Sequence, residues 1–220
     1  MSSNSKMGHV DLHQIIEGRT ESDRIPRALK AAHTAFVGIL IPTYARQYGP
    51  GNFLWFSDVA LLTSVPALWL ESSLLASTQA VGVLVPESLW LVDFGAGILF
   101  KKYPIGLASY MIDRRIPRFV RALSLFHLWL TPVLVLIVSR AGYDRRAFKH
   151  QVLITWVILL ASWRLTKPED NVNWVYSRPR QIQSRGARAG FVLFLMAVLP
   201  LVFHLPAHVL LKRLFPSPTP

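Results

Sequence analysis

Long apolar runs, separated by short basic segments, constrain this chain more than any other feature of its sequence. Of its 220 residues, 52% are hydrophobic and 16% are charged. A helix that crosses a bilayer needs roughly 20 mostly apolar residues. Open sheets leave backbone groups unpaired in lipid, and no alternating strand pattern appears. The expected fold is therefore an all-α, polytopic transmembrane helix bundle with about six spans, within a range of about five to seven.

The chain divides into three regions by composition. Residues 1–30 form a polar N-terminal segment, residues 31–213 form the bundle, and residues 214–220 form a Pro-rich tail. The N-terminal segment lacks the short basic region and apolar core of a cleaved signal peptide. We therefore expect an integral, multi-pass membrane protein, and the sequence leaves open which membrane holds it.

One apolar stretch, from Leu74 to Phe100, decides the number of spans. Pro86 and Glu87 divide it into two pieces that are each too short to cross a bilayer. We interpret it as one span that is bent at Pro86, with a re-entrant first half as the alternative. The other expected spans are residues 31–48, 52–70, 118–138, 148–165 and 189–211.

The distribution of basic residues favours a different count. Six spans divide the 24 Lys and Arg residues almost evenly between the two sides of the membrane, whereas seven spans place 17 of them on one side. Basic residues prefer the cytoplasmic side, so the charge pattern favours an odd number. Span length favours six, because the two halves of 74–100 are short.

The formal net charge of +12 does not predict a nucleic-acid-binding protein. The basic residues lie in short loops between apolar runs, where membrane topology and anionic lipid headgroups account for them. We therefore expect membrane lipids as partners and no nucleic acid, and leave open a membrane-protein partner or a second copy of the chain. Cysteine is absent, which excludes disulfides, thiolate metal sites and a cysteine nucleophile.

Ionisable groups inside apolar spans are costly and usually functional. One such set lies in the fourth span, where Ser124, His127 and Thr131 share one helix face. The imidazole of His127 could act as a general base, a ligand or a proton carrier. The alternative is a structural histidine that joins two helices by a hydrogen bond. In either case we expect His127 to face the bundle interior beside Ser57 or Asp58.

Two carboxylates and two further histidines also fall within the spans. Asp58 and Asp93 need a partner in such a medium, and a buried structural ion pair is an alternative to catalysis. His204 and His208 have the i, i+4 spacing of a metal pair, but Pro206 lies between them and no HExxH pattern accompanies them. The sequence therefore predicts no metal site and no cofactor.

Three short stretches carry a resemblance to a known family. The segment Phe126-His-Leu-Trp-Leu-Thr-Pro132 resembles the His-x-x-x-x-Pro segment of the androgen-induced family of six-pass membrane hydrolases, which act on fatty acid esters of hydroxy fatty acids, and of the related ether-lipid transacylase-like bacterial proteins. Residues 52–58 are similar to the second-helix segment that carries the nucleophile there. Asn173-Trp-Val-Tyr176, followed by Arg178-Pro179, is similar to the motif before the last helix.

The resemblance implies roles for particular residues. His127 aligns with the histidine that acts as the catalytic base in that family. The hydrolase threonine falls on Trp55, which cannot be a nucleophile, whereas the transacylase cysteine falls on Ser57. Ser57 is thus the nucleophile that the resemblance implies.

Two functional hypotheses follow. In the first, an intramembrane lipid ester hydrolase or acyltransferase uses Ser57 as nucleophile, His127 as base, and Asp58 or Asp93 to orient or balance the imidazolium. In the second, the protein is a noncatalytic membrane component, such as a transporter or an accessory subunit, and the same groups are structural or line a pathway. The residues expected to bind substrate are Trp55, Asp93, Ser124, Thr131 and Asn173.

Overall fold

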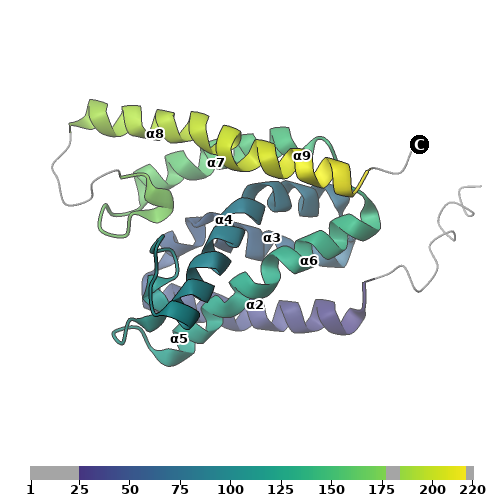
Figure 1. Cartoon of the computed structure of the whole chain (residues 1–220), viewed down its shortest axis with the longest axis horizontal. Coiled ribbons are helices and arrows are strands. Elements are labelled where there is room, and N and C mark those ends of the chain that lie inside the picture. Colours follow the sequence, from purple (N-terminus) through teal and green to yellow (C-terminus); the bar gives the residue numbers. More distant parts are fainter. Residues whose placement is uncertain (1–24, 177–183, 217–220) are drawn as a thin grey trace, which may run out of the picture.

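Helices arranged as a bundle make up the computed structural model, which describes residues 25–176 and 184–216 (Figure 1). No strand occurs within those ranges. The helices are α2 (Arg27–Tyr48), α3 (Phe56–Leu70), α4 (Ser73–Phe100), α5 (Arg118–Leu123), α6 (His127–Ala141), α7 (Ala147–Leu165), α8 (Arg185–Leu199) and α9 (Leu205–Leu214). The expected all-α class is confirmed.

Three helical segments are long and apolar enough to cross a membrane: Ser73–Phe100, Arg118–Ala141 and Gly186–Leu214. Many large apolar side chains on them face outward, as in proteins whose surroundings are hydrocarbon. Val92, Leu99, Leu193 and Leu201 are each more than half exposed. These segments are typical of a membrane protein.

Helix α4 is the centre of the bundle and packs against α3, α6, α7 and α9. Its 28 residues run without interruption through Pro86, so the apolar stretch is one helix and not two pieces. Ser72 caps its N-terminus by accepting a hydrogen bond from the Leu75 amide at 3.3 Å. Lys101 ends it in the left-handed conformation, with φ 57°.

Two expected spans contain local departures from regular α-helix. A 3-10 turn at Ser124–Phe126 separates α5 from α6, directly before His127. A π-helical turn at Pro200–His204 separates α8 from α9. Such departures are frequent at functional sites because they re-aim side chains. The first expected span also begins earlier than predicted, at Arg27, within the segment that composition had assigned to the polar N-terminus.

Polar contacts join the helices inside the bundle. His33 Nε2 lies 2.7 Å from Ser64 Oγ, between α2 and α3. At the start of α2, Lys30 Nζ lies 2.8 Å from Glu71 Oε1, at the turn between α3 and α4. Because hydrocarbon offers polar groups no partner, bonds of this kind help to specify which helices pack together.

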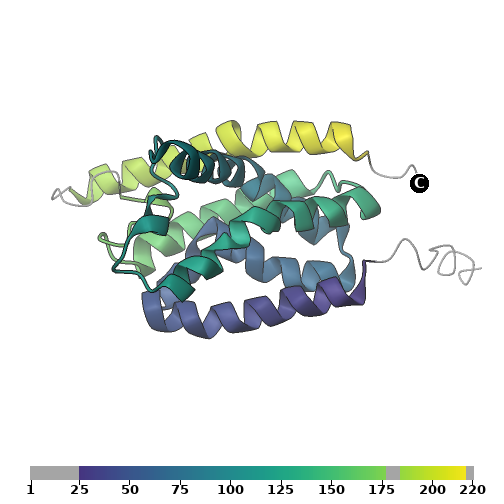
Figure 2. The same cartoon turned by 60° about the horizontal axis from the view of Figure 1, so that its bottom comes forward.

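The two longer connections lie at the same end of the bundle. Residues 101–117, between α4 and α5, and residues 166–176, after α7, both lie at the left end in Figure 1, where α2 ends and α3 begins. Figure 2 shows the same grouping from a second direction. The chain thereby surrounds this end with loops, and the candidate site lies there.

A candidate active-site cavity

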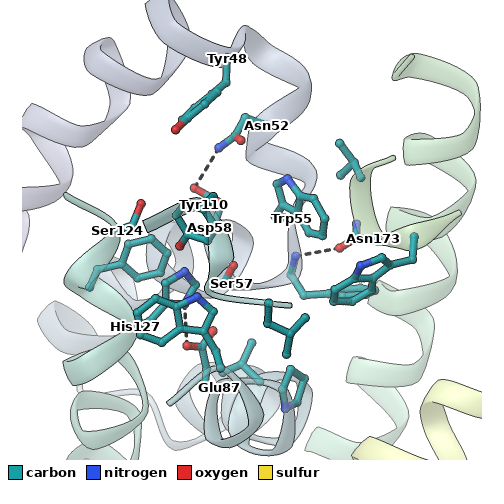
Figure 3. Close-up of a pocket in the computed structure, with 18 of the residues that line it drawn as sticks. Tyr48, Asn52, Trp55, Ser57, Asp58, Glu87, Tyr110, Ser124, His127 and Asn173 are labelled. Carbon is teal, nitrogen blue, oxygen red and sulfur yellow. Dashed lines mark hydrogen bonds and ion pairs between the residues drawn. The ribbon is translucent and has the colours of Figure 1, made fainter. Parts of the chain in front are cut away.

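A cavity of about 610 Å³ opens among α2, α3, α4, the start of α6 and the two long connections. Its polar lining includes Tyr44, Tyr48, Asn52, Ser57, Asp58, Glu87, Ser109, Tyr110, Ser124, His127, Asn173 and His204. Figure 3 shows Asp58, Tyr110, Ser124 and His127 together on one side, and Trp55 and Asn173 on the other. Six of the eight residues that the sequence singled out, Trp55, Ser57, Asp58, Ser124, His127 and Asn173, line this one cavity.

His127 is held by a carboxylate that the sequence analysis did not select. Its Nδ1 lies 2.7 Å from Oε2 of Glu87 on α4. The Glu87 side chain is 3% exposed and that of His127 is 12% exposed. A carboxylate oxygen accepts, so Nδ1 donates and Nε2 is the ring nitrogen left to take a proton.

Two aromatic rings fix the plane of the imidazole. The ring centroids of Trp90 and His127 are 4.5 Å apart, and those of Phe126 and His127 are 4.1 Å apart, both in stacked geometry. Within the described residues Nε2 makes no hydrogen bond. The expectation that His127 faces the interior is confirmed, but the expectation that its partner comes from the second span is wrong, because Glu87 of α4 takes that place.

Ser57 lies in the first turn of α3, which begins at Phe56 and has Trp55 as its N-cap residue, with φ −59° and ψ 138°. This arrangement places Ser57 in the cavity wall. Within the described part of the chain its hydroxyl makes no hydrogen bond to His127. Ser57 and His127 line the same cavity, and catalytic hydrogen bonds often form only when substrate is present.

Asp58 is 4% exposed and lines the same wall. Its Oδ1 accepts a long hydrogen bond, 3.5 Å, from the side-chain amide of Asn52. Asp58 does not touch His127 through a hydrogen bond in the described residues. The role of orienting the imidazole, which the sequence assigned to Asp58 or Asp93, belongs geometrically to Glu87.

Asp93 lies outside the cavity lining and shapes the loop that covers it. Its carboxylate accepts hydrogen bonds from the amides of Ile105 at 2.8 Å, Gly106 at 3.2 Å and Ala108 at 2.8 Å. These bonds fold residues 101–117 back over the end of the bundle, so that Tyr110 enters the cavity wall. Asp93 therefore supports the site from a distance.

Asn173 also positions other parts of the wall. Its Oδ1 accepts from the Phe56 amide at 3.2 Å, and its Nδ2 donates to Leu54 O at 2.7 Å and to Ser162 Oγ at 3.0 Å. Its amide is thus fully engaged in fixing the start of α3 against α7. Trp55 packs edge-to-face on Trp174, with ring centroids 5.4 Å apart.

The stripe expected on the fourth span is only partly present. Ser124 Oγ lies 2.7 Å from the hydroxyl of Tyr44, and both line the cavity. Thr131 lies outside the cavity lining, and its buried hydroxyl has no hydrogen-bond partner in the described residues. The 3-10 turn before His127 separates the residues that a regular helix would align.

His204 and His208 do not form a pair. His204 Nε2 lies 2.8 Å from Thr155 Oγ1, whereas His208 Nδ1 lies 2.6 Å from the Tyr143 hydroxyl. Within residues 25–176 and 184–216, no group of three or more His, Cys, Asp or Glu side chains is arranged to hold a metal ion. No protein-family model, curated protein or solved structure matches this chain.

Proposed function

We propose that this protein is an intramembrane enzyme that hydrolyses lipid esters or transfers their acyl groups. One observation carries the proposal: the Glu87 and His127 side chains are hydrogen-bonded at 2.7 Å in the wall of a cavity that Ser57 also lines. An acid that orients a histidine, and a hydroxyl within the same cavity, are the parts of a serine-type acyl-transfer site.

In the proposed mechanism, Ser57 Oγ attacks the ester carbonyl carbon as Nε2 of His127 removes the hydroxyl proton. Glu87 holds Nδ1–H and stabilises the imidazolium that forms. The side-chain amide of Asn52 and the hydroxyl of Tyr110, on the same wall, are the donors that we assign to the oxyanion.

The second half of the reaction uses the same groups. The imidazolium returns its proton to the leaving alcohol as the carbon–oxygen bond breaks, which leaves an acyl-Ser57 intermediate. Water, or the hydroxyl of an acceptor lipid, then attacks the acyl carbon and gives its proton to Nε2. The bond between the acyl carbon and Ser57 Oγ breaks, and the imidazolium returns the proton to Oγ. The choice between water and an alcohol distinguishes hydrolysis from acyl transfer.

The proposal includes six membrane passes. Besides the three long apolar segments, α2 has 22 residues and α7 has 19, while α3 has 15 and is preceded by a 3-10 turn at Pro50–Leu54. Ile39 on α2 and Val157 on α7 are both more than half exposed, as lipid-facing residues would be. The cavity, which lies at one end of the bundle, would then lie near one membrane surface, where ester groups of lipids reside.

Turnover by purified protein in lipid nanodiscs tests the proposed reaction. Wild-type protein should release a fluorogenic alcohol from fatty acyl esters, and Ser57→Ala should lower the rate by about 10³-fold or more. Ser88→Ala is the matched control, because this exposed serine of α4 bonds only its own helix at Leu84 O. Absence of turnover across short, medium and long acyl chains would favour the noncatalytic hypothesis.

A further inference from the structure

The charged residues known to line the cavity are all acidic. Asp58, Glu87 and Asp170 line it, and no Lys or Arg of residues 25–176 and 184–216 does. This is opposite to the balance of the chain, which has 24 Lys and Arg residues against 12 Asp and Glu residues. These carboxylates would repel an anionic ligand and attract a cation.

The two buried carboxylates, Glu87 and Asp58, differ in the groups that lie beside them. The Glu87 carboxylate faces the imidazole of His127 at 2.7 Å. The Asp58 side chain, in a residue that is 4% exposed, receives only the long bond from Asn52, and its Oδ2 has no protein partner in the described residues. A carboxylate without a counter-charge away from water tends to take up a proton, and a cation beside it stabilises the ionised form. Asp58 is therefore the buried carboxylate of the cavity that lacks a counter-charge among the described residues.

Aromatic rings line the same cavity as this carboxylate. Tyr44, Tyr48, Trp55, Trp90, Tyr110 and Trp174 all line the cavity. The faces of such rings attract ammonium groups, and most strongly those whose carbon substituents make them weakly hydrated. A bare metal ion would instead need several oxygen ligands close together, and no cluster of three or more metal-ligating side chains exists among the described residues.

We infer that the cavity binds an organic cation, a substituted or quaternary ammonium group, with its charge at Asp58 and its alkyl groups against the tyrosine and tryptophan rings. The inference about binding stands on the cavity itself. Its extension to the substrate, an ester that carries a cationic head, rests on the function proposed above. The bound cation would balance Asp58, which otherwise repels the oxyanion formed at Ser57.

Two ligands of the same shape, one with a positive charge and one neutral, test the binding directly. The butyl ether of choline has a positively charged nitrogen at the position where the butyl ether of 3,3-dimethylbutanol has a neutral carbon. Binding to the full-length protein in nanodiscs is measured by titration calorimetry and by tryptophan fluorescence, with butyl sulfate as the anion. We expect the choline ether to bind at least about 10-fold more tightly than its neutral isostere, and butyl sulfate to bind no more tightly than the neutral ether.

Two variants test whether the preference for the choline ether arises in the cavity. Asp58→Asn should reduce the preference for the choline ether to less than about 2-fold, whereas Asp144→Asn, which removes a carboxylate paired with Arg146 outside the cavity lining, should leave it unchanged. Equal binding of the two ethers by wild-type protein, or tighter binding of butyl sulfate, would overturn the inference, with no variant needed. Ser57→Ala should still bind the choline ether, so cation binding without any turnover would reject the proposed reaction and keep this inference.

Discussion

His127 Nδ1 lies 2.7 Å from Glu87 Oε2, across two helices and 40 residues of sequence. The pair explains how a histidine can remain inside an apolar bundle. Its Nδ1–H donates to a carboxylate, its ring stacks on Trp90 and Phe126, and the residue lines a cavity. Each of these contacts restricts the imidazole to one orientation, as a general base requires.

The pair should act as one catalytic unit. Glu87→Gln keeps the size of the side chain but removes its charge, and His127→Ala removes the base. Each should lower the turnover of a fluorogenic acyl ester by about 10²–10⁴-fold. The double variant should be no slower than His127→Ala alone, because residues that work as a unit are not additive.

A matched carboxylate controls for loss of charge. Glu169→Gln, at an exposed position outside the cavity lining, should leave turnover unchanged. Melting temperatures are measured beside the rates. If His127→Ala lowered the melting temperature but kept the turnover of the folded fraction, the histidine would be structural and the catalytic assignment would be lost.

Gly82 allows close packing of α4 on α7. A Cβ built there would lie 2.6 Å from Cδ of Gln151, a side chain that is 2% exposed. Gly82→Ala should therefore reduce the free energy of unfolding by about 1–3 kcal/mol. Gly38→Ala is the control, since nothing lies within 4 Å of its Cβ position in α2, and alanine there should be neutral or stabilising. Equal thermal stability of the two variants would contradict this packing.

Asp93 should contribute to both stability and activity through the loop that it holds. Asp93→Ala removes two acceptor oxygens and with them three hydrogen bonds from buried or partly buried amides, at 2.8, 3.2 and 2.8 Å. It should destabilise the protein by about 2–4 kcal/mol. Residues 101–117 should then become accessible to protease under conditions that leave the wild-type loop intact. A loop that stays protected in the variant would show that other contacts hold it.

Tyr110 gives the site a dependence on alkaline pH. Burial raises the pKa of its hydroxyl above the ordinary value of about 10, and the negative charge of Glu87 raises it further. Because the folded-state pKa is the higher one, the stability from the neutral hydroxyl is present below pH of about 10 and is lost as pH rises through the folded-state value. Tyr110→Phe should thus leave the tyrosinate absorbance at pH of about 11 unchanged, whereas a decrease would show that Tyr110 already ionises there.

The sequence predicted the architecture because apolar length is a local property. The runs around Ser73–Phe100, Arg118–Ala141 and Gly186–Leu214 can be recognised without knowing their neighbours. It also predicted much of the cavity lining, since polar residues in apolar segments must meet one another inside the bundle.

The partner of His127 was missed for a physical reason. Glu87 was interpreted with Pro86 as a division of the apolar stretch, whereas proline can lie inside a long packed helix whose neighbours satisfy the freed carbonyl. The signal was present, because an acidic residue within 28 helical residues is itself a candidate for function. Tyr110 had no such signal, because it lies in a polar connection that the hydrogen bonds of Asp93 help to fold over the cavity.

The most direct test of the account is to map the adduct of a long-chain alkyl fluorophosphonate on the protein in nanodiscs. Fluorophosphonates modify only activated hydroxyl groups, and Ser109, which lines the same cavity, serves as the internal comparison. We predict a single adduct on Ser57, which is retained in Ser109→Ala and absent in Ser57→Ala and His127→Ala. Labelling that persists in folded His127→Ala, an adduct on a different serine, or no adduct at all would contradict the assignment of Ser57 and His127 as nucleophile and base.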